Sequence, residues 1–251
     1  GLYAPSFKLF IMKFQLCFFV LFSVIGCAPE FYAPNRIQIP ELKQKGDVRL
    51  SGATGYLQIE AQFAYALTNN IGVLSNFANY GSSTDETGFD EGGGGGIEFG
   101  AGYFSSKKNV IFENYATIGF GNFYNNSKYV SPFYPDDDGK LNSNFTKLSL
   151  QSSLTFQHHY FSISAACRLS NLTYNDINGN YTKVSTNLGG YLRSNPIHYF
   201  VEPAIQIGAG FKNIRLNLQY QYSHHFNGNS DYYYTNYNYS AGIQLSFPAK
   251  K

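Results

Sequence analysis

Residues 237–247 read Tyr-Asn-Tyr-Ser-Ala-Gly-Ile-Gln-Leu-Ser-Phe, and apolar side chains alternate in this run with small or amide side chains. Successive side chains of a β-strand point to opposite faces, so one face of this run is apolar and the other is polar. Residues 214–222, Ile-Arg-Leu-Asn-Leu-Gln-Tyr-Gln-Tyr, alternate in the same way. This period of two predicts two strands at the end of the chain.

The same alternation continues through most of the chain from Asp47 onward. Most of the runs are longer than the roughly 5–6 residues of a globular strand and match the roughly 9–11 of a transmembrane strand. Residues 184–195 read either as a further strand or as part of a loop with a short helix, so eight or twelve strands stay possible. We predict ten strands, over residues 47–54, 56–67, 71–80, 95–105, 110–121, 145–157, 160–172, 199–211, 214–225 and 235–247.

Composition indicates which face meets lipid. Charged residues make up 14% of the 251-residue chain, against roughly 25% in a soluble domain. A soluble barrel has the same period with its apolar face inside. Here the polar face carries many glycines and few lysines, which suits a crowded interior. We therefore predict an all-β fold, a closed antiparallel up-and-down transmembrane β-barrel, since an open edge cannot be satisfied in lipid. The net charge of +2 gives no reason to expect nucleic acid as a partner.

The N-terminal part has the features of a targeting segment. Lys13 precedes an apolar run that is too short to span a bilayer, and Val24-Ile25-Gly26-Cys27 resembles the lipobox of bacterial lipoproteins. That resemblance implies cleavage before Cys27 and its lipidation. We expect residues 1–11 to be a non-native upstream extension, 12–26 a lipoprotein signal peptide, 27–46 a periplasmic linker and 47–251 the barrel.

Connection lengths orient the predicted barrel. Short turns alternate with longer connections at 81–94, 122–144, 173–198 and 226–234, as periplasmic turns alternate with extracellular loops. We therefore expect a bacterial outer-membrane location, with the N-terminus periplasmic and the long loops extracellular. The five consecutive glycines at 92–96 read as part of a flexible loop.

Charged residues on the predicted inner face are balanced in sign. We expect them to form an internal salt-bridge network that fills a narrow barrel, because an unpaired buried charge costs several kcal/mol. A charged constriction in a pore is the alternative. The eight residues are Arg49, Glu60, Glu98, Glu113, Lys147, Arg168, Glu202 and Arg215.

Other chemistry-bearing residues give weaker signals. The pairs His158-His159 and His224-His225 point to opposite faces of a strand, so we predict no metal site. Ser223 and His225 share a face, with His198 near a strand start, which leaves a lipid-modifying enzyme as an alternative. We assign no catalytic residue and no cofactor, and we expect that the chain is not an enzyme.

The region after Cys27 carries a family resemblance. Tyr32-Ala33-Pro34-Asn35, Pro40-Glu41-Leu42 and Lys45-Gly46-Asp47 resemble the lead of predicted outer-membrane β-barrel lipoproteins of Bacteroidetes, as does the hairpin at residues 62–72. The resemblance implies a location and an architecture but no activity. The partners then expected are outer-membrane lipid, the barrel-assembly machinery during biogenesis, and a possible surface ligand.

These expectations give three hypotheses for the function. The first is a largely plugged, lipid-anchored barrel with an envelope-structural or surface-interaction role. The second is a narrow pore or transporter for small or apolar solutes, which requires an open lumen. The third is a lipid-modifying enzyme, which requires serine, histidine and an acid or amide together on the outer wall.

Overall fold

A computed structural model describes residues 31–55, 58–83, 90–127, 139–183, 186–211, 213–226, 232 and 234–249. The predicted extension at 1–11, the predicted signal peptide at 12–26 and the predicted lipidation residue Cys27 lie outside these residues.

Ten long strands form the wall of the molecule. A connection between two of them contains the two-residue strand β8 (Thr186–Asn187) and the helix α2 (Leu188–Ser194), and β11 (His224–His225) is equally short. The long strands are β1 (Val48–Gly55), β2 (Gln58–Ala66), β3 (Ile71–Ser83), β4 (Asp90–Lys107), β5 (Val110–Ser127), β6 (Gly139–Gln157), β7 (Phe161–Lys183), β9 (Ile197–Gly210), β10 (Ile214–Tyr222) and β12 (Tyr237–Phe247).

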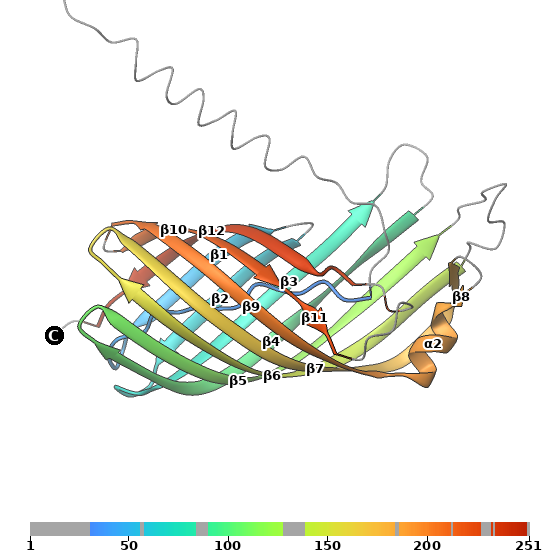
Figure 1. Ribbon diagram of the computed structural model, residues 1–251, viewed down its shortest axis with the longest axis horizontal. Coiled ribbons are helices and arrows are strands. Elements are labelled where there is room, and N and C mark those ends of the chain that lie inside the picture. The colour runs from blue at the N-terminus through green and yellow to red at the C-terminus, as the bar shows by residue number, and fades with distance from the viewer. Residues whose placement is uncertain are drawn as a thin grey trace, which may run out of the picture.

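The ten strands close into an antiparallel barrel, as Figure 1 shows. Sequence neighbours pair from β1 to β7 and from β9 to β10, and β10 pairs with β12. Two pairings close the ring, β12 with β1 and β7 with β9. The predicted fold class and the count of ten are confirmed. The segment 184–195 adds no wall strand, and its described part is largely the helix α2.

The exposed and buried faces have the polarity of a membrane barrel. Along β10, Leu216 and Leu218 are each 62% exposed, whereas Asn217 and Gln219 are each 3% exposed. A soluble protein buries its leucines and exposes its amides, so this inversion indicates an outer surface that faces lipid and a polar interior. No helix in the described part of the chain is long and apolar enough to cross a membrane.

Strand lengths differ around the barrel. Strands β4 to β7 contain 18 to 23 residues, whereas β1, β2, β10 and β12 contain 8 to 11. A transmembrane strand needs roughly 9–11, so β4–β7 have residues to spare and extend beyond the others toward the α2 end (Figure 1). The glycines at 92–96, which we expected in a flexible loop, belong to β4, because β3 and β5 pair with them on both sides.

A stretch of chain lies inside the barrel. Residues 31–47, which we call the luminal segment, run lengthwise through it before β1 begins, drawn in blue in Figure 1. Nearly all of residues 31–42 are buried. We expected a periplasmic linker over 27–46, but residues 31–42 pack against the inner wall. Ten strands leave more space than the eight whose side chains just fill a barrel, and the segment occupies that space.

Candidate functional site: the occupied lumen

Amide side chains of the wall bind the backbone in the middle of the luminal segment. Gln58 and Asn238 donate to the carbonyl oxygen of Pro34, at 2.9 and 3.0 Å. Gln219 accepts from the Ile37 amide at 3.0 Å and donates to the Ile37 carbonyl at 2.9 Å. Later carbonyls have the same kind of partner, Gln151 for Gln38 and Gln244 for Pro40. Because this stretch belongs to no sheet, side chains satisfy its buried backbone.

Two buried glutamates accept backbone N–H groups of the segment. Glu60 accepts from the Arg36 amide at 2.7 Å. Glu113 accepts from the amides of Glu41 at 3.0 Å and Leu42 at 3.2 Å. Hydrogen bonds to a charged acceptor are shorter and stronger than neutral ones. The two carboxylates therefore fix the segment at two depths of the lumen.

A buried ion pair joins β7 and β9 at the level of Asn35. Arg168 Nε donates to Glu202 at 2.5 Å, and Arg168 Nη2 donates to the Asn35 carbonyl at 2.9 Å. The other Glu202 oxygen accepts from the Tyr32 hydroxyl at 3.0 Å and from the Ser223 hydroxyl at 2.8 Å. A buried ion pair is favourable only when further hydrogen bonds complete it. The luminal segment supplies two of those bonds.

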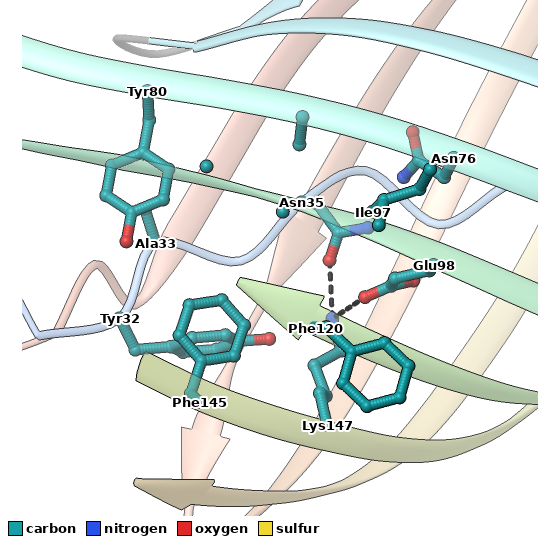
Figure 2. Close-up of a pocket in the computed structure, with 13 residues that line it drawn as sticks. Tyr32, Ala33, Asn35, Asn76, Tyr80, Ile97, Glu98, Phe120, Phe145 and Lys147 are labelled. Carbon is teal, nitrogen blue, oxygen red and sulfur yellow. Dashed lines mark hydrogen bonds and ion pairs between the residues drawn. The ribbon is translucent and has the colours of Figure 1, made fainter. Parts of the chain in front are cut away.

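A second ion pair, between β4 and β6, binds the side chain of Asn35. Lys147 Nζ lies 2.5 Å from Glu98 Oε1 and donates to Asn35 Oδ1, also at 2.5 Å. Figure 2 shows both groups directed at the ammonium. A cavity of about 30 Å³ adjoins this cluster, with Asn76 and Tyr80 in its lining. That volume suits one or two water molecules and is far below the roughly 300–1,000 Å³ of a small-molecule site.

The start of the segment lies in an aromatic cluster at one end of the barrel. The rings of Tyr32 and Phe200 are 4.6 Å apart, and the Tyr174 hydroxyl donates to the Phe31 carbonyl at 2.8 Å. Tyr232 and two leucines of α2 belong to the same cluster. These last residues come from the connections that follow β7 and β10. The segment therefore begins at the barrel end that carries the long connections, which we call the long-loop end.

The segment ends at the opposite end of the barrel. The Lys45 amide donates to Asn69 Oδ1 at 3.0 Å, and Asp47 Oδ1 accepts from the Ala249 amide at 3.2 Å. Asn69 lies in the short turn between β2 and β3, and Ala249 follows β12. We expected a periplasmic N-terminus and extracellular long loops, but Phe31 lies on the same side of the barrel as the long connections.

Charge and apolar packing fix the segment just before that end. Glu41 forms an ion pair with Arg215 and accepts from the Ser162 hydroxyl at 3.0 Å. Leu42 is fully buried in an apolar cluster with wall residues. The wall glycine Gly72 leaves room for it, because a Cβ at that position would lie 2.8 Å from Leu42 Cδ1.

All eight predicted interior charges point into the lumen, but only four pair with one another. Arg168 pairs with Glu202, and Lys147 pairs with Glu98. The other four bind the luminal segment: Arg215 pairs with Glu41, Arg49 pairs with Asp47, and Glu60 and Glu113 accept backbone amides. Half of the interior charges therefore bind the luminal segment, and only the other half form ion pairs within the wall.

Sequence reasoning missed the partners that come from the segment itself. Arg36, Glu41 and Asp47 lie within or at the edge of a stretch that reads as a linker, and the wall glutamines look like ordinary polar-face residues. One signal was available. A transmembrane barrel with so many inward amides and acids needs polar partners for them, and a charged, proline-interrupted lead is one source.

The serine and histidines considered for catalysis lie inside the barrel, away from the lipid face. Ser223 is fully buried and donates to Glu202. His198 Nδ1 and His225 Nε2 are 2.9 Å apart, and both rings pack against Tyr232. These residues therefore do not form the outer-wall constellation that the lipid-modifying hypothesis requires.

The lipid-facing surface, the polar interior and the closed ring together define an outer-membrane β-barrel. No protein-family model and no curated protein matches the chain. Among solved structures it is similar to the outer membrane protease OmpT from Escherichia coli, with a TM-score of 0.49, 10% identity and coverage of 83% of this chain and 97% of that one. It is also similar to the KdgM porin, with a TM-score of 0.38, 10% identity and coverage of 80% of this chain and 99% of that one. A third similar structure is Ail, the attachment invasion locus protein of Yersinia pestis, with a TM-score of 0.35, 12% identity and coverage of 81% of this chain and 100% of that one.

One expectation is corrected by these comparisons. We expected that the chain is not an enzyme, but the barrels to which it is similar include a protease. That expectation is therefore withdrawn. At 10% identity the likeness concerns the fold alone, and no activity passes from that protein to this one.

Proposed function

We propose that this protein is an outer-membrane barrel closed by its own luminal segment, with an envelope-structural or surface-interaction role at its long-loop end. The observation that carries the proposal is the row of wall side chains bonded to the segment backbone from Pro34 to Leu42. A continuous water path would need these contacts to separate. Closure by a bound chain argues against free diffusion of solutes.

The surface-interaction part of the proposal rests on the long strands. Beyond the apolar band, β6 and β7 expose mainly asparagine, and some of these side chains bond across the strands, such as Asn144 to Asp176 at 3.3 Å. These exposed amides form a polar outer surface on two paired strands, whose inner side packs into the aromatic cluster through Leu141 and Tyr174. Rigid elements position contact residues better than loops do, so this projecting wall is the proposed contact surface for a ligand.

The proposal includes a lipid anchor at Cys27, which rests on the motif Val24-Ile25-Gly26-Cys27 and on the resemblance to Bacteroidetes barrel lipoproteins. Labelled palmitate should enter the wild-type protein and not the variant Cys27→Ser. Equal labelling of both would remove the anchor from the proposal and leave the closed lumen untouched.

Planar-bilayer recording tests the closed lumen. The wild-type protein should insert without steady conductance, and a variant lacking residues 31–46 should conduct steadily. The shortened variant also shows that insertion takes place in the assay, and heat-modifiable gel mobility checks that both proteins are folded. Steady conductance of the wild-type protein, equal to that of the shortened variant, would contradict the proposal.

A gated pore is the second candidate function. The specific observation in its favour is that the strands close the barrel without the segment. Strand β12 pairs with β1, and β7 pairs with β9. Displacement of the segment would therefore open a lumen without breaking the wall. Conductance that appears in the wild-type protein only under applied voltage or after addition of a solute would favour this candidate.

A further inference from the structure

The direction of the luminal segment has a topological consequence. Its first described residues, Phe31 and Tyr32, lie in the aromatic cluster at the long-loop end, and Lys45 and Asp47 contact the short-turn end. The segment therefore crosses the barrel once, from the long-loop end to the short-turn end. Everything that precedes Phe31 must join the segment at the long-loop end.

We propose that the mature amino end of this protein leaves the barrel on the cell-surface side and that its lipid anchor enters the outer leaflet there. This inference rests on the closed lumen proposed above. It reverses the usual expectation for a barrel with an N-terminal lead, in which the lead and its anchor stay in the periplasm.

Chain length limits where the anchor can be. Only four peptide units separate Cys27 from Phe31, and an extended chain covers at most about 3.5 Å per residue, or roughly 14 Å in total. The hydrophobic band of a barrel is about 25 Å tall. Acyl chains on Cys27 could therefore reach the leaflet next to the long-loop end but not the one next to the short turns.

The contacts at the start of the segment support a fixed exit. The Tyr32 hydroxyl donates to Glu202, and the Thr235 amide donates to the Tyr32 carbonyl at 2.9 Å. Tyr32 also forms a parallel bridge with Tyr234, which lies in the connection between β10 and β12. The exit is thus tied to a long connection by backbone bonds, and tilting the segment back toward the short turns would break them.

Which end faces the cell exterior follows from the connections. Short turns lie at the end that holds Asn69. Apart from the two-residue connection between β1 and β2, the connections at the other end are longer, as in barrels whose turns are periplasmic and whose loops are extracellular. Under that orientation the luminal segment delivers the amino end to the surface. The charged side chains of the wall would then hold the luminal segment in this direction.

Accessibility of an epitope tag in intact cells tests the inference. In the full chain, the tag is placed between Glu30 and Phe31, in the β5–β6 connection, or in the turn at Thr68–Asn70, and a membrane-impermeant antibody is applied before and after permeabilisation. The first two tags should react in intact cells, and the turn tag should react only after permeabilisation. Heat-modifiable mobility identifies the folded variants.

Two results would overturn the inference: protection of the tag before Phe31 while the β5–β6 tag reacts, or reaction of the turn tag alone. If the first tag prevents folding, the variant Glu30→Cys in a Cys167→Ala background, treated with a membrane-impermeant maleimide, gives the same readout with one small side chain. If the tag experiment gives one of these two results and the wild-type protein shows no steady conductance in the bilayer, the surface exit of the amino end is refuted and the closed lumen is kept. A conducting wild type refutes the closed lumen itself.

Discussion

The wall and the luminal segment come from one chain but satisfy their backbones differently. Strand β5 pairs along its whole length with β4 and β6, so wall backbone bonds wall backbone. Between Pro34 and Pro40 the segment instead depends on side chains such as Gln58 and Gln219. Over this stretch the wall uses the segment mainly to satisfy its side chains, whereas the segment needs the wall for its backbone. At its end the segment also bonds wall backbone, where Gly46 and Asp47 pair with Ala66 of β2. Removing the segment should leave a ring with unsatisfied interior groups.

The largest effect is expected where both regions meet. Arg168→Met leaves Glu202 buried without its ion partner and removes the donor to the Asn35 carbonyl. We expect a loss of about 3–5 kcal/mol in the free energy of unfolding, measured by urea titration in lipid vesicles. The control is Lys107→Met, at the exposed last residue of β4, and it should change little. Adding Glu202→Met should recover part of the loss, and no recovery would contradict the assignment.

A smaller effect is expected from a change to the lipid face of the wall. Leu216→Arg places a charge on a side chain that is 62% exposed toward lipid, which costs about 2–4 kcal/mol near the middle of the bilayer. The matched control is Phe211→Arg beside the short turn before β10, where the cost is about 0–1 kcal/mol. Neither change touches the segment, so neither should alter conductance. Equal tolerance of both would argue against the lipid-facing assignment.

A change to the segment alone is expected to cost less. Glu113→Gln replaces one of the two oxygens that accept the amides of Glu41 and Leu42. A buried donor left without a partner costs about 1–3 kcal/mol. The unfolding titration should show that loss, and bilayer recording should show brief openings. The control Asp176→Asn, at an exposed position, should show neither the loss of stability nor the openings. If Glu113→Gln also left both unchanged, the claim that Glu113 holds the segment backbone would be contradicted.

The smallest effect is expected at a packing contact between the two regions. Gly72→Ala places a methyl group 2.8 Å from Leu42 Cδ1, and the flexible leucine can shift, so the cost should be about 1 kcal/mol. At the control position, Gly52→Ala meets no atom closer than 4.0 Å. Combining Gly72→Ala with Leu42→Val should recover part of the loss, because the Tyr115 hydroxyl still lies 3.0 Å from the added methyl group. Purely additive losses would show that Leu42 does not pack there.

The wall could be predicted from the sequence because its signal is local. Leu216, Asn217 and Leu218 reveal the two faces within three residues, and the same period places Lys147 and Glu98 inside before any contact is known. Strand ends were less predictable. The glycines at 92–96 lack side chains that could show alternation, yet β3 and β5 bond their backbone on both sides.

The luminal segment could not be predicted because its partners are remote in sequence. Ile37 bonds Gln219, 182 positions away, and Gln38 bonds Gln151, 113 positions away. Prolines at 34 and 40 break any strand period, so the stretch reads as a linker. Half of the eight interior charges bind the luminal segment, which no local pattern shows entering the lumen.

Methyl NOE spectroscopy of the full-length protein in lipid nanodiscs tests the occupied lumen most directly. Ile37 and Ile39 of the segment form one buried cluster with Ala166 of β7 and Ala204 of β9. The structure predicts NOE cross-peaks between the isoleucine and alanine methyl groups and their absence after deletion of residues 31–46. Isoleucine methyl groups with the shifts of a disordered chain and no cross-peak to either alanine would contradict the occupied lumen.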